Sequence, residues 1–400
     1  AGFSAGCGCS LATAATMSKV AYPSMIPPHV PPAVEHLLNA PQARREHACR
    51  QAAQALADAR IVVVPTETLY GLAASAHHAR LLDPITGPGP RTWHAPSADR
   101  LLDLLGPLHP LHRRLISVFC PGPVRFDVHL PPDRLAEIRA RLGVQAGVID
   151  TGQALLVRVP DDPIASALAT LSDAPIVIDR IPDRWPGGVA SGLWRPDAMP
   201  DTVAMILDAG PPRYGRPSAR IELLPDPPWY RAHPGGVVEP RTVDRRARRR
   251  LLFVCTGNTC RSPMAEAIAR ALLAERGGLV GGIPTDVASA GTSAMEGDMS
   301  SPENDAALAS VGVPPSSHRA RHLTRTMLAD ADLVYTMTRQ HARAAQSLGS
   351  DARIETLDPD GHDVPDPIGQ GLPVYEATAR RLRDLIQARL RQLDQSGEAP

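Results

Sequence analysis

The 400-residue sequence predicts two α/β domains in series. Short apolar segments of strand type alternate with helical segments on both sides of an arginine-rich stretch, RTVDRRARRR (241–250). Hydrophobic residues make up 43% of the chain and charged residues 21%, a composition typical of a globular protein with a packed core. Since a domain usually has about 100–200 residues, this length suits two domains with a boundary close to residue 250.

The first domain, expected over residues 33–240, mixes strands and helices without a simple alternation. The segment IVVVP (61–65) is uniformly apolar, which is typical of a buried strand. No internal repeat relates this half of the chain to the other half. Further strands are expected at 124–130, 155–160 and 175–179, and helices at 134–141 and 163–171.

The second domain, expected over residues 251–400, alternates strands and helices. This alternation predicts a doubly wound parallel sheet with helices on both faces, and ligands bind such sheets at the carboxyl ends of the strands. Strands are expected at 251–255, 286–290, 331–337 and 353–357, and a helix at 263–275. The last helix has one apolar face, formed by Leu382, Leu385, Ile386, Leu390 and Leu393.

The stretch 241–250 is predicted to be a basic, solvated linker, and contact with RNA or phosphate is the alternative. Residues 1–32 are expected to be a disordered extension, and a misplaced start with Met17 as the true beginning is the alternative. A secretory signal is not expected, because these residues lack its basic and apolar regions. No apolar run of about 20 residues is present, so neither a membrane span nor a membrane partner is expected. Six cysteines are too few for a disulfide scaffold of this length, which indicates a cytoplasmic protein. The formal net charge of 0 gives no bulk argument for nucleic acid.

The segment VCTGNTCRSP (254–263) joins the first strand of the second domain to its first helix. Ser262 suits the N-cap of that helix and Pro263 its first position. The loop 256–260 therefore lies at a helix N-terminus, where free backbone N–H groups bind anions. This arrangement predicts an anion cradle directly after the strand.

Three side chains in and near this cradle fit phosphoryl transfer. The cradle and Arg261 are expected to lower the pKa of the Cys255 thiol, which makes Cys255 a covalent nucleophile. Arg261 can hold two phosphoryl oxygens in a bidentate fork. Asp366 precedes Pro367 on a stiff loop, and its carboxyl group suits a general acid. A buried structural cysteine is the alternative interpretation of Cys255, and no metal site is predicted.

The second half of the chain resembles the low-molecular-weight protein tyrosine phosphatase family. The resemblance spans 251–393 and implies Cys255 as nucleophile, Arg261 as phosphate binder, Asp366 as general acid, a phosphorylated protein as partner and no cofactor. It rests on CTGNTCRS (255–262), SAGTSA (289–294), ADLVYTMT (331–338) and DPIG (366–369). Residues expected to support the phosphate loop are Thr256, Gly257, Asn258, Thr259, Cys260 and Ser262. Arsenate reductases of the thioredoxin-coupled type resemble this loop but need further cysteines downstream, and none follows Cys260.

Two positions make the resemblance closer to the protein-arginine phosphatase branch of that family. Thr259 stands where tyrosine-specific relatives carry an aliphatic residue. Ile368 stands where phosphotyrosine-directed members carry an aromatic residue that stacks on the substrate ring. A preference for phosphoarginine over phosphotyrosine is therefore expected, with broad specificity as the alternative.

The segment PTETLYGLAASA (65–76) follows the first apolar strand and resembles the opening of the YrdC-like threonylcarbamoyl-adenylate synthase family. Further matches extend the resemblance over 33–237: CPGPVRFDV (120–128), LLVRVPDDPIA (155–165), ILDAG (206–210) and GRPSARIE (215–222). Members of this family join L-threonine, bicarbonate and ATP into threonylcarbamoyl-AMP, a precursor of a modified tRNA adenosine. The resemblance implies a substrate pocket with Thr66, Thr68 and Tyr70, and a nucleotide side with Arg158 and Ser218.

This first domain departs from the family at two places. The family's Lys-x-Arg pair has no lysine here, because Lys19 is the only lysine of the chain, and Arg91 is the candidate for the arginine. The family's Ser-Ala-Asn is replaced by Arg180, Ile181 and Pro182. A triphosphate would lose charge-assisted bonds worth about 1.5–3 kcal/mol each. A degenerate domain that binds nucleotide or RNA, double-stranded RNA included, is therefore expected, and an active synthase is the alternative.

Overall fold

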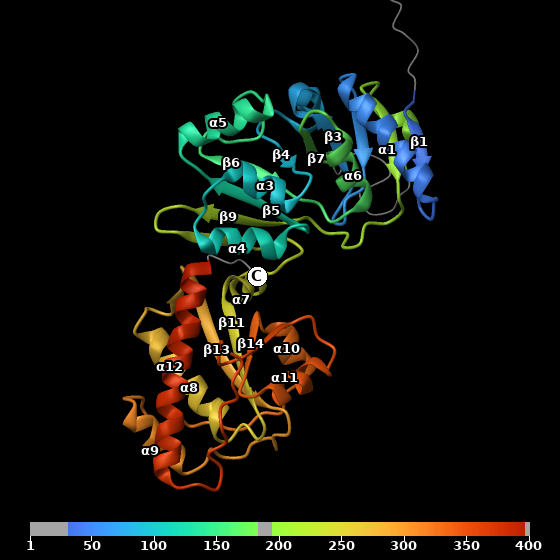
Figure 1. Cartoon of the computed structure of the whole chain (residues 1–400). Coiled ribbons are helices and arrows are strands. Elements are labelled where there is room, and N and C mark those ends of the chain that lie inside the picture. The colour runs from blue at the N-terminus through green and yellow to red at the C-terminus, as the bar shows by residue number, and fades with distance from the viewer. Residues whose placement is uncertain (1–30, 183–193, 397–400) are drawn as a thin grey trace, which may run out of the picture.

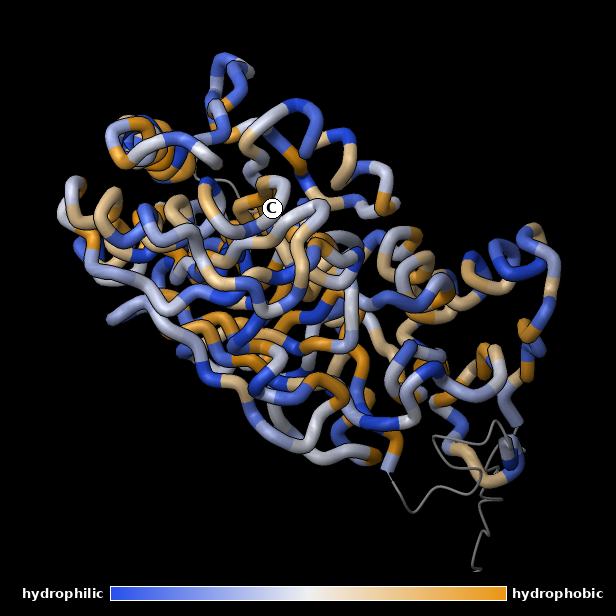
Figure 2. Tube along the Cα trace, turned by 90° about the horizontal axis from the view of Figure 1, so that it is seen from below, coloured by the Kyte–Doolittle hydropathy of each residue, from blue (hydrophilic) through white to orange (hydrophobic). Residues whose placement is uncertain are grey.

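The computed structural model describes residues 31–182 and 194–396, which form two lobes joined end to end (Figure 1). Both lobes are α/β, as the sequence predicts. Hydrophobic residues gather inside each lobe and hydrophilic residues lie at the periphery (Figure 2). Of the predicted disordered extension 1–32, all but the last two residues lie outside the described part of the chain.

A ten-stranded mixed sheet forms the centre of the N-terminal lobe, in the order β1-β8-β2-β3-β7-β4-β6-β5-β9-β10. Four of its strands, β2, β5, β6 and β7, were predicted and are confirmed. The other six were not predicted, and they include β8, whose largely apolar run of six residues, VAMILD, was overlooked. The bounds are β1 Ala33–His36, β2 Ile61–Val64, β3 Gly71–Ser75, β4 Thr92–His94, β5 Val124–His129, β6 Ala154–Arg158, β7 Ile176–Arg180, β8 Val203–Asp208, β9 Ala219–Leu224 and β10 Trp229–His233.

Helices cover this sheet, and the predicted helix at 163–171 shows why they form where they do. The Asp162 carboxylate accepts the N–H groups of Ile164 and Ala165, both at 2.9 Å, and Pro163 takes the first helical position. This helix packs against α1. The bounds are α1 Gln42–Ala57, η1 Ala76–Leu82, α2 Asp83–Thr86, α3 Ala98–Leu105, α4 Pro110–Phe119, α5 Pro132–Leu142, α6 Pro163–Leu171 and η2 Pro196–Ala198.

The C-terminal lobe is built on a five-stranded sheet in the order β12-β13-β11-β14-β15. The four strands from β13 to β15 are parallel, which confirms the predicted doubly wound sheet, and β12 adds an antiparallel edge. None of the described helices is long and apolar enough to cross a membrane. The strands are β11 Arg249–Cys255, β12 Leu279–Val280, β13 Ile283–Gly291, β14 Leu333–Thr336 and β15 Arg353–Thr356. The helices are α8 Arg261–Ala274, α9 Glu303–Ser310, α10 Arg325–Asp330, α11 Arg339–Gln346 and α12 Leu372–Ser396.

Alternate residues of β11 enter two separate cores, as expected for a strand buried on both faces. Leu251 and Phe253 pack into the core under α8 and α12, whereas Leu252 and Val254 pack into a smaller core on the other face. The apolar face of the last helix contributes Leu382, Leu385, Ile386, Leu390 and Leu393 to the first of these cores, as predicted. β11 runs away from the N-terminal lobe, so its carboxyl end lies at the far side of the molecule (Figure 1).

The prediction of a solvated linker at 241–250 is wrong. The segment forms α7 (Pro240–Ala247) and then the start of β11. Val243 and Ala247 lie one helical turn apart and are buried in the core of the N-terminal lobe. Arg249 is also buried and donates to the carbonyl of Val280. Val243 and Ala247, the two buried apolar residues of this segment, therefore anchor it to the N-terminal lobe.

A buried arginine joins the two lobes. Arg114 of α4 is 2% exposed and donates to the carbonyls of Arg246 and Arg248, both at 2.9 Å. Its Nη2 also bonds the carboxylate of Asp332, at 2.9 Å from Oδ2, and Asp332 directly precedes β14. Because these partners include both α7 and the C-terminal sheet, Arg114 holds the lobes in a fixed relation.

Replacing Asp332 with alanine is expected to lower the free energy of unfolding by about 3–5 kcal/mol, because the buried guanidinium of Arg114 loses its counter-charge. Urea denaturation measures this loss. Asp330→Ala is the matched control: Asp330 forms surface pairs with Arg245 and Arg250, so its removal should cost less than about 1 kcal/mol. Equal effects of the two substitutions would contradict the assignment.

Candidate functional site

Cys255 ends β11, and the loop 256–260 turns from it directly into α8. The Cys255 sulfur is buried, accepts the N–H of Asn258 at 3.3 Å and lies 2.9 Å from Ser262 Oγ. Sulfur, loop and helix N-terminus therefore come together as the sequence predicts.

Ser262 bonds within the loop, as the family resemblance implies, and does not form the helix cap that its sequence position predicts. α8 begins at Arg261, two residues before the predicted start at Pro263, and its N-cap residue Cys260 makes no capping hydrogen bond through its side chain. The Ser262 hydroxyl instead lies between the Cys255 sulfur and the Asn258 amide, 2.9 Å from each. Ser262 is thus placed to stabilise negative charge on the sulfur.

Asn258 organises the loop from a left-handed backbone conformation, with φ of 53°. Its Nδ2 donates to the hydroxyls of Ser262 and Ser289, both at 2.9 Å, and its Oδ1 accepts the N–H of Arg321 at 2.8 Å. Gly291 leaves room for this loop, since a Cβ there would lie 2.4 Å from the Thr256 carbonyl oxygen. The motif SAGTSA is therefore the wall against which the loop packs.

Arg261 is 4% exposed, and its guanidinium faces the loop from the helix side. Nη1 donates to the carbonyl of Val364 at 3.0 Å, and Nη2 lies 3.4 Å from Thr256 Oγ1 and pairs with the Asp366 carboxylate. The buried Nε–H of Arg261 has no partner among the described residues. Arg261, the predicted phosphate binder, and Asp366, the predicted general acid, are thus neighbours. The Nε–H group of Arg261 remains as a donor for a phosphoryl oxygen.

Burial of the sulfur raises the pKa of Cys255, so the predicted lowering does not hold for this arrangement. The Ser262 hydroxyl and N–H, the Arg261 charge and the Asn258 N–H all lower the pKa of Cys255, as expected, but burial outweighs them. The positive charge of Arg261 is also shared with Asp366, which weakens its effect on the sulfur.

The remaining loop residues lie at increasing depth. Thr256 is exposed, Gly257 and Thr259 are half-buried, and Cys260 is buried. The Cys260 sulfur lies 2.9 Å from Ser301 Oγ and 3.4 Å from the hydroxyl of Tyr375. Cys260 therefore anchors the base of the loop.

His341 contacts the loop but was not predicted from the sequence. Its Nε2 lies 2.8 Å from Thr256 Oγ1, and its Nδ1 lies 3.0 Å from the hydroxyl of Thr338, the N-cap of α11. Burial and the nearby Arg261 lower the pKa of His341 to about 4, so the ring is neutral at physiological pH. The sequence shows Thr338 as a helix cap with His341 three residues later. It does not show that His341 lies beside the loop, because only the fold brings α11 there.

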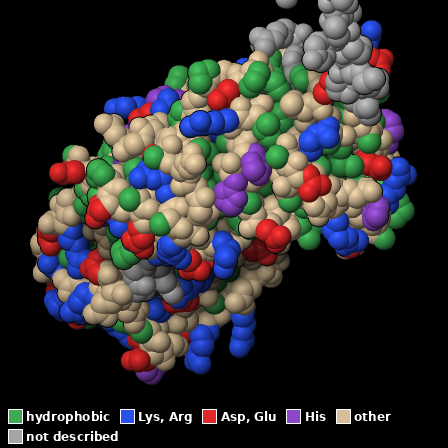
Figure 3. Space-filling model, turned by 90° about the horizontal axis from the view of Figure 1, so that it is seen from above, with side chains coloured by type: hydrophobic (Ala, Val, Ile, Leu, Met, Phe, Trp, Pro, Cys, Tyr) green, Lys and Arg blue, Asp and Glu red, His purple; other side chains and the backbone are tan. Residues whose placement is uncertain are grey.

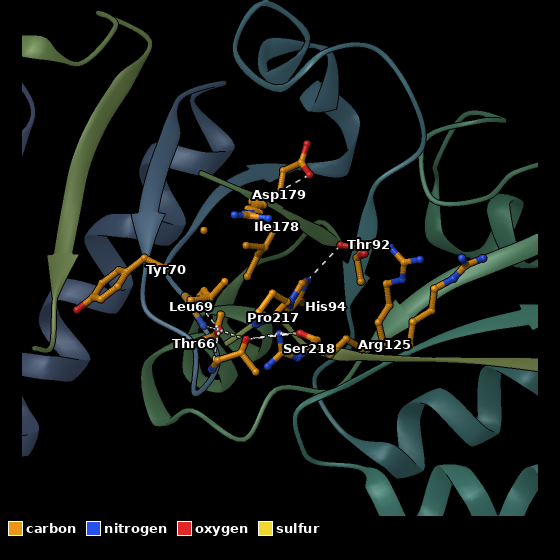
Figure 4. Close-up of a pocket in the computed structure, with 15 residues that line it drawn as sticks. Thr66, Leu69, Tyr70, Thr92, His94, Arg125, Ile178, Asp179, Pro217 and Ser218 are labelled. Carbon is orange, nitrogen blue, oxygen red and sulfur yellow. Dashed lines mark hydrogen bonds between the residues drawn. The ribbon is translucent and has the colours of Figure 1, made fainter. Parts of the chain in front are cut away.

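A cavity of about 290 Å³ in the N-terminal lobe brings together all five residues predicted there, Thr66, Thr68, Tyr70, Arg158 and Ser218 (Figure 4). Arg158 Nη1 donates to Thr68 Oγ1 at 3.0 Å and to Ser218 Oγ at 2.6 Å. The ring of Tyr70 is turned away from this group, and its hydroxyl donates to the carbonyl of Gly210 at 2.8 Å. Four of the five side chains thus converge.

Arg91, the candidate for the family's arginine, lies outside the cavity lining. It is buried and pairs with the carboxylates of Asp83 and Asp179, so its charge holds the cavity wall together. Arg180 does line the cavity, whereas Ile181 is buried in the core. Arg91 and Ile181 therefore do not replace the polar ligands that the family's Lys-x-Arg and Ser-Ala-Asn residues would supply to the cavity.

The sequence did not predict His94, Arg125 and Arg220 as cavity residues. Burial, and then the charge of Arg158, lower the pKa of His94 to about 3, which keeps its ring neutral. Ser218 and Arg220 are two residues apart, a spacing that puts both on one face of a strand. The alignment of Arg125 beside them depends on strand register, which the sequence does not reveal.

In comparisons with known proteins the two lobes are similar to different families. The low molecular weight phosphotyrosine protein phosphatase model matches residues 250–399. The low molecular weight protein-tyrosine-phosphatase PtpB of Staphylococcus epidermidis is 36% identical over 143 residues, which cover 34% of this chain and 94% of that protein. The chain belongs to the low molecular weight phosphotyrosine protein phosphatase family. The protein-arginine-phosphatase of Bacillus subtilis is equally similar to this phosphatase lobe, at 36% over 149 residues, covering 36% of this chain and 95% of that protein.

The N-terminal lobe has its own relatives. The Sua5/YciO/YrdC model, described as telomere recombination, matches residues 54–230. The threonylcarbamoyl-AMP synthase of Bacillus subtilis is 29% identical over 202 residues, which cover 47% of this chain and 54% of that protein. The chain therefore spans about half the length of this relative. The fusion of a YrdC-like domain with a phosphatase-family domain, predicted from the sequence, is confirmed.

Asp366→Asn is expected to lower the pKa of Cys255, because the charge of Arg261 is then no longer balanced by a carboxylate. The rate of iodoacetamide labelling of Cys255, followed by mass spectrometry across pH, should rise at lower pH than in the wild type. Asp363→Asn is the control, since Asp363 accepts the N–H of Arg339 rather than a bond from Arg261. A larger shift in the control would contradict this reasoning.

Proposed function

We propose that the C-terminal lobe hydrolyses phosphorylated protein side chains through a phosphocysteine intermediate on Cys255. The observation that supports this most is the unpartnered Nε–H of the buried Arg261 beside the sulfur loop. A buried donor without an acceptor costs about 1–3 kcal/mol, and a phosphoryl oxygen would remove that cost. Nε and Nη2 together form the fork that binds two such oxygens.

The proposed reaction has two displacements at phosphorus. The Cys255 sulfur attacks, the bond to the leaving atom breaks, and Asp366 gives that atom a proton, while the loop N–H groups and Arg261 hold the three phosphoryl oxygens. Water then attacks the phosphocysteine, Asp366 accepts its proton, and phosphate leaves with the thiolate restored. Binding of the phosphoryl group to Arg261 replaces the Arg261–Asp366 pair, which frees the carboxyl group for the leaving atom.

Cys255→Ser is expected to abolish hydrolysis of p-nitrophenyl phosphate, because serine is not ionised at this position. Asp366→Asn should lower kcat by about 10²–10⁴-fold, the usual share of general acid catalysis. Steady-state assays of the full chain measure both effects. Cys49→Ala, which changes a free thiol on α1 of the other lobe, is the control and should keep full activity. Activity in Cys255→Ser would refute the nucleophile assignment.

For the substrate we propose phosphoarginine over phosphotyrosine. Thr259 carries a hydroxyl beside Cys260, with Oγ1 at 3.6 Å from the sulfur, where an aliphatic branch would crowd a guanidinium. Ile368 is 62% exposed next to the Asp366-Pro367 pair and offers no aromatic face. A phenyl ring thereby lacks a stacking partner worth about 0.5–1.5 kcal/mol.

The ratio of kcat/KM for phosphoarginine to that for phosphotyrosine is expected to exceed one in the wild type. It should fall in Thr259→Ile, because the branched side chain replaces the hydroxyl near the substrate nitrogen atoms. Parallel steady-state assays on the two free phosphoamino acids test this. A wild type that prefers phosphotyrosine, or an unchanged ratio in Thr259→Ile, would disprove the specificity while leaving the nucleophile in place.

For the N-terminal lobe we propose a degenerate YrdC-like domain that binds a ligand without making threonylcarbamoyl-AMP. Arg91 is engaged with Asp83 and Asp179, and Arg180 takes the place of a small polar residue in the cavity wall. Acidic and basic side chains are interspersed over the face seen from above (Figure 3), which favours a small ligand over RNA at that face. The described cysteines are free thiols, which suits the reducing cytoplasm proposed as its location.

Incubation of the full chain with ATP, L-threonine and bicarbonate is expected to release no pyrophosphate above background. The physical reason is the absent lysine together with the bulky cation at position 180. A coupled pyrophosphate assay measures the release, with a YrdC-like enzyme that carries both motifs as the positive control. Turnover comparable to that control would show that the rebuilt cavity still supports synthesis.

A further inference from the structure

His341 is brought to the Cys255 loop by the neighbouring strand of the sheet. β14 pairs with β11 in parallel, with Thr336 beside Val254, and the N–H of Met337 donates to the carbonyl of Val254 at 2.9 Å. The carboxyl ends of both strands therefore reach the same edge of the sheet. α11 begins two residues after Met337 and carries His341 in its first turn, so the imidazole ring lies beside the loop that follows Cys255.

Each nitrogen of this buried ring faces one hydroxyl group. Nε2 of His341 lies 2.8 Å from Thr256 Oγ1, and Nδ1 lies 3.0 Å from Thr338 Oγ1. Burial, and then the charge of Arg261, lower the pKa of His341 to about 4, so the ring is neutral at physiological pH. A neutral imidazole has one N–H group, so one of its nitrogens donates a hydrogen bond and the other accepts one.

The surroundings of Thr338 decide which nitrogen carries the hydrogen. Thr338 Oγ1 accepts the backbone N–H of His341 at 3.2 Å, as the N-cap of α11. The Thr338 hydroxyl is half-buried, and Nδ1 of His341 is the only acceptor that it reaches among the described residues. Since buried polar groups are nearly always hydrogen-bonded, this hydroxyl donates to Nδ1. The ring hydrogen is then on Nε2, which donates to Thr256.

Thr256 connects these hydrogen bonds to Arg261. Nη2 of Arg261 lies 3.4 Å from Thr256 Oγ1 and also pairs with the Asp366 carboxylate. A hydroxyl oxygen can accept two hydrogen bonds, and the two donors here are His341 and Arg261. The Nε2–H group of His341 thus holds the Thr256 oxygen in place as an acceptor that faces Nη2.

This contact gains importance when a substrate binds. Under the function proposed above, on which this inference rests, a phosphoryl oxygen displaces Asp366 from Nη2. Val364 then holds Nη1, at 3.0 Å, and Thr256 is the one side chain among the described residues that still holds Nη2. We propose that His341 is a positioning residue for the phosphatase reaction, which keeps the Thr256 oxygen against Arg261 so that Nε and Nη2 face the phosphoryl group.

Steady-state assays of the full chain with p-nitrophenyl phosphate test this role through a pair of amide variants. The side-chain amide of glutamine reaches about as far as Nε2, whereas that of asparagine reaches only about as far as Nδ1. His341→Gln should therefore keep most of the wild-type kcat/KM. His341→Asn should lower kcat/KM by about three- to tenfold, the effect of one lost hydrogen bond, and should weaken competitive inhibition by inorganic phosphate by a similar factor.

Thr256→Val shows whether the two residues act together. It removes the hydroxyl and should lower kcat/KM about as much as His341→Asn does. Because His341 acts through Thr256, the double variant should be no less active than either single variant. Losses that multiply in the double variant, or equal losses in His341→Gln and His341→Asn, would overturn the proposal. Gln346→Asn is the control, since Gln346 is exposed at the last position of the same helix, and it should match the wild type.

Nuclear magnetic resonance locates the ring hydrogen without an activity assay. Long-range correlation spectra of the nitrogen-15-labelled wild type at neutral pH are expected to show Nε2–H for His341, whose signal is identified by its loss in His341→Gln. A ring that carries its hydrogen on Nδ1 would overturn the proposed direction of the hydrogen bonds.

Thermal denaturation shows which variants retain the fold. If His341→Asn unfolds, Thr256→Val is compared with Thr256→Ser, which keeps the hydroxyl. A loss of kcat/KM in Thr256→Val alone then supports the role, and no loss overturns it. A wild type without phosphatase activity would instead overturn the proposed function itself, and the role of His341 with it.

Discussion

The loop 256–260 depends on the side-chain amide of Asn258. This one group joins the loop to the Cys255–Ser262 pair, to Ser289 on β13 and to the backbone of Arg321. It does so from a left-handed backbone conformation that asparagine tolerates better than most residues. Ser289 in turn donates to the buried carboxylate of Glu266 at 2.6 Å, so the hydrogen-bond network continues into α8. The sulfur is thereby held by two strands and a helix rather than by the loop alone.

Much of the phosphatase lobe could be predicted from the sequence, because its strands are continuous apolar runs and its last helix has a regular apolar face. The loop was predictable for the same reason, since Cys255, Arg261 and Pro263 lie close together in the chain. Ser262 was expected both to cap the helix and, from the family resemblance, to support the loop. Only the cap is wrong, because the rule for helix caps does not include competition from a buried sulfur. His341 was missed because 85 residues separate it from Thr256, and only the packing of α11 brings them together.

The N-terminal lobe was harder to predict for a different physical reason. Its sheet includes short edge strands whose sequences alternate weakly, and its cavity is assembled from strands distant in sequence. Motifs found Thr66, Thr68 and Ser218, but strand register decides that Arg125 stands between Arg158 and Arg220. The segment 241–250 was mistaken for a solvated linker because its many arginines suggested exposure to water. Val243, which is buried among them, was overlooked.

The direction of β11 has a consequence for how the two lobes work together. The strand starts at the joint beside Arg114's partners and advances about 3.3 Å per residue, so its seven residues carry Cys255 roughly 20 Å away from the joint. The loop 256–260 therefore lies on the side of its lobe that faces away from the other lobe (Figure 1). Every described residue that lines the N-terminal cavity belongs to the N-terminal lobe. A molecule bound there can therefore influence the Cys255 loop only through the interface between the lobes, to which Arg114 belongs.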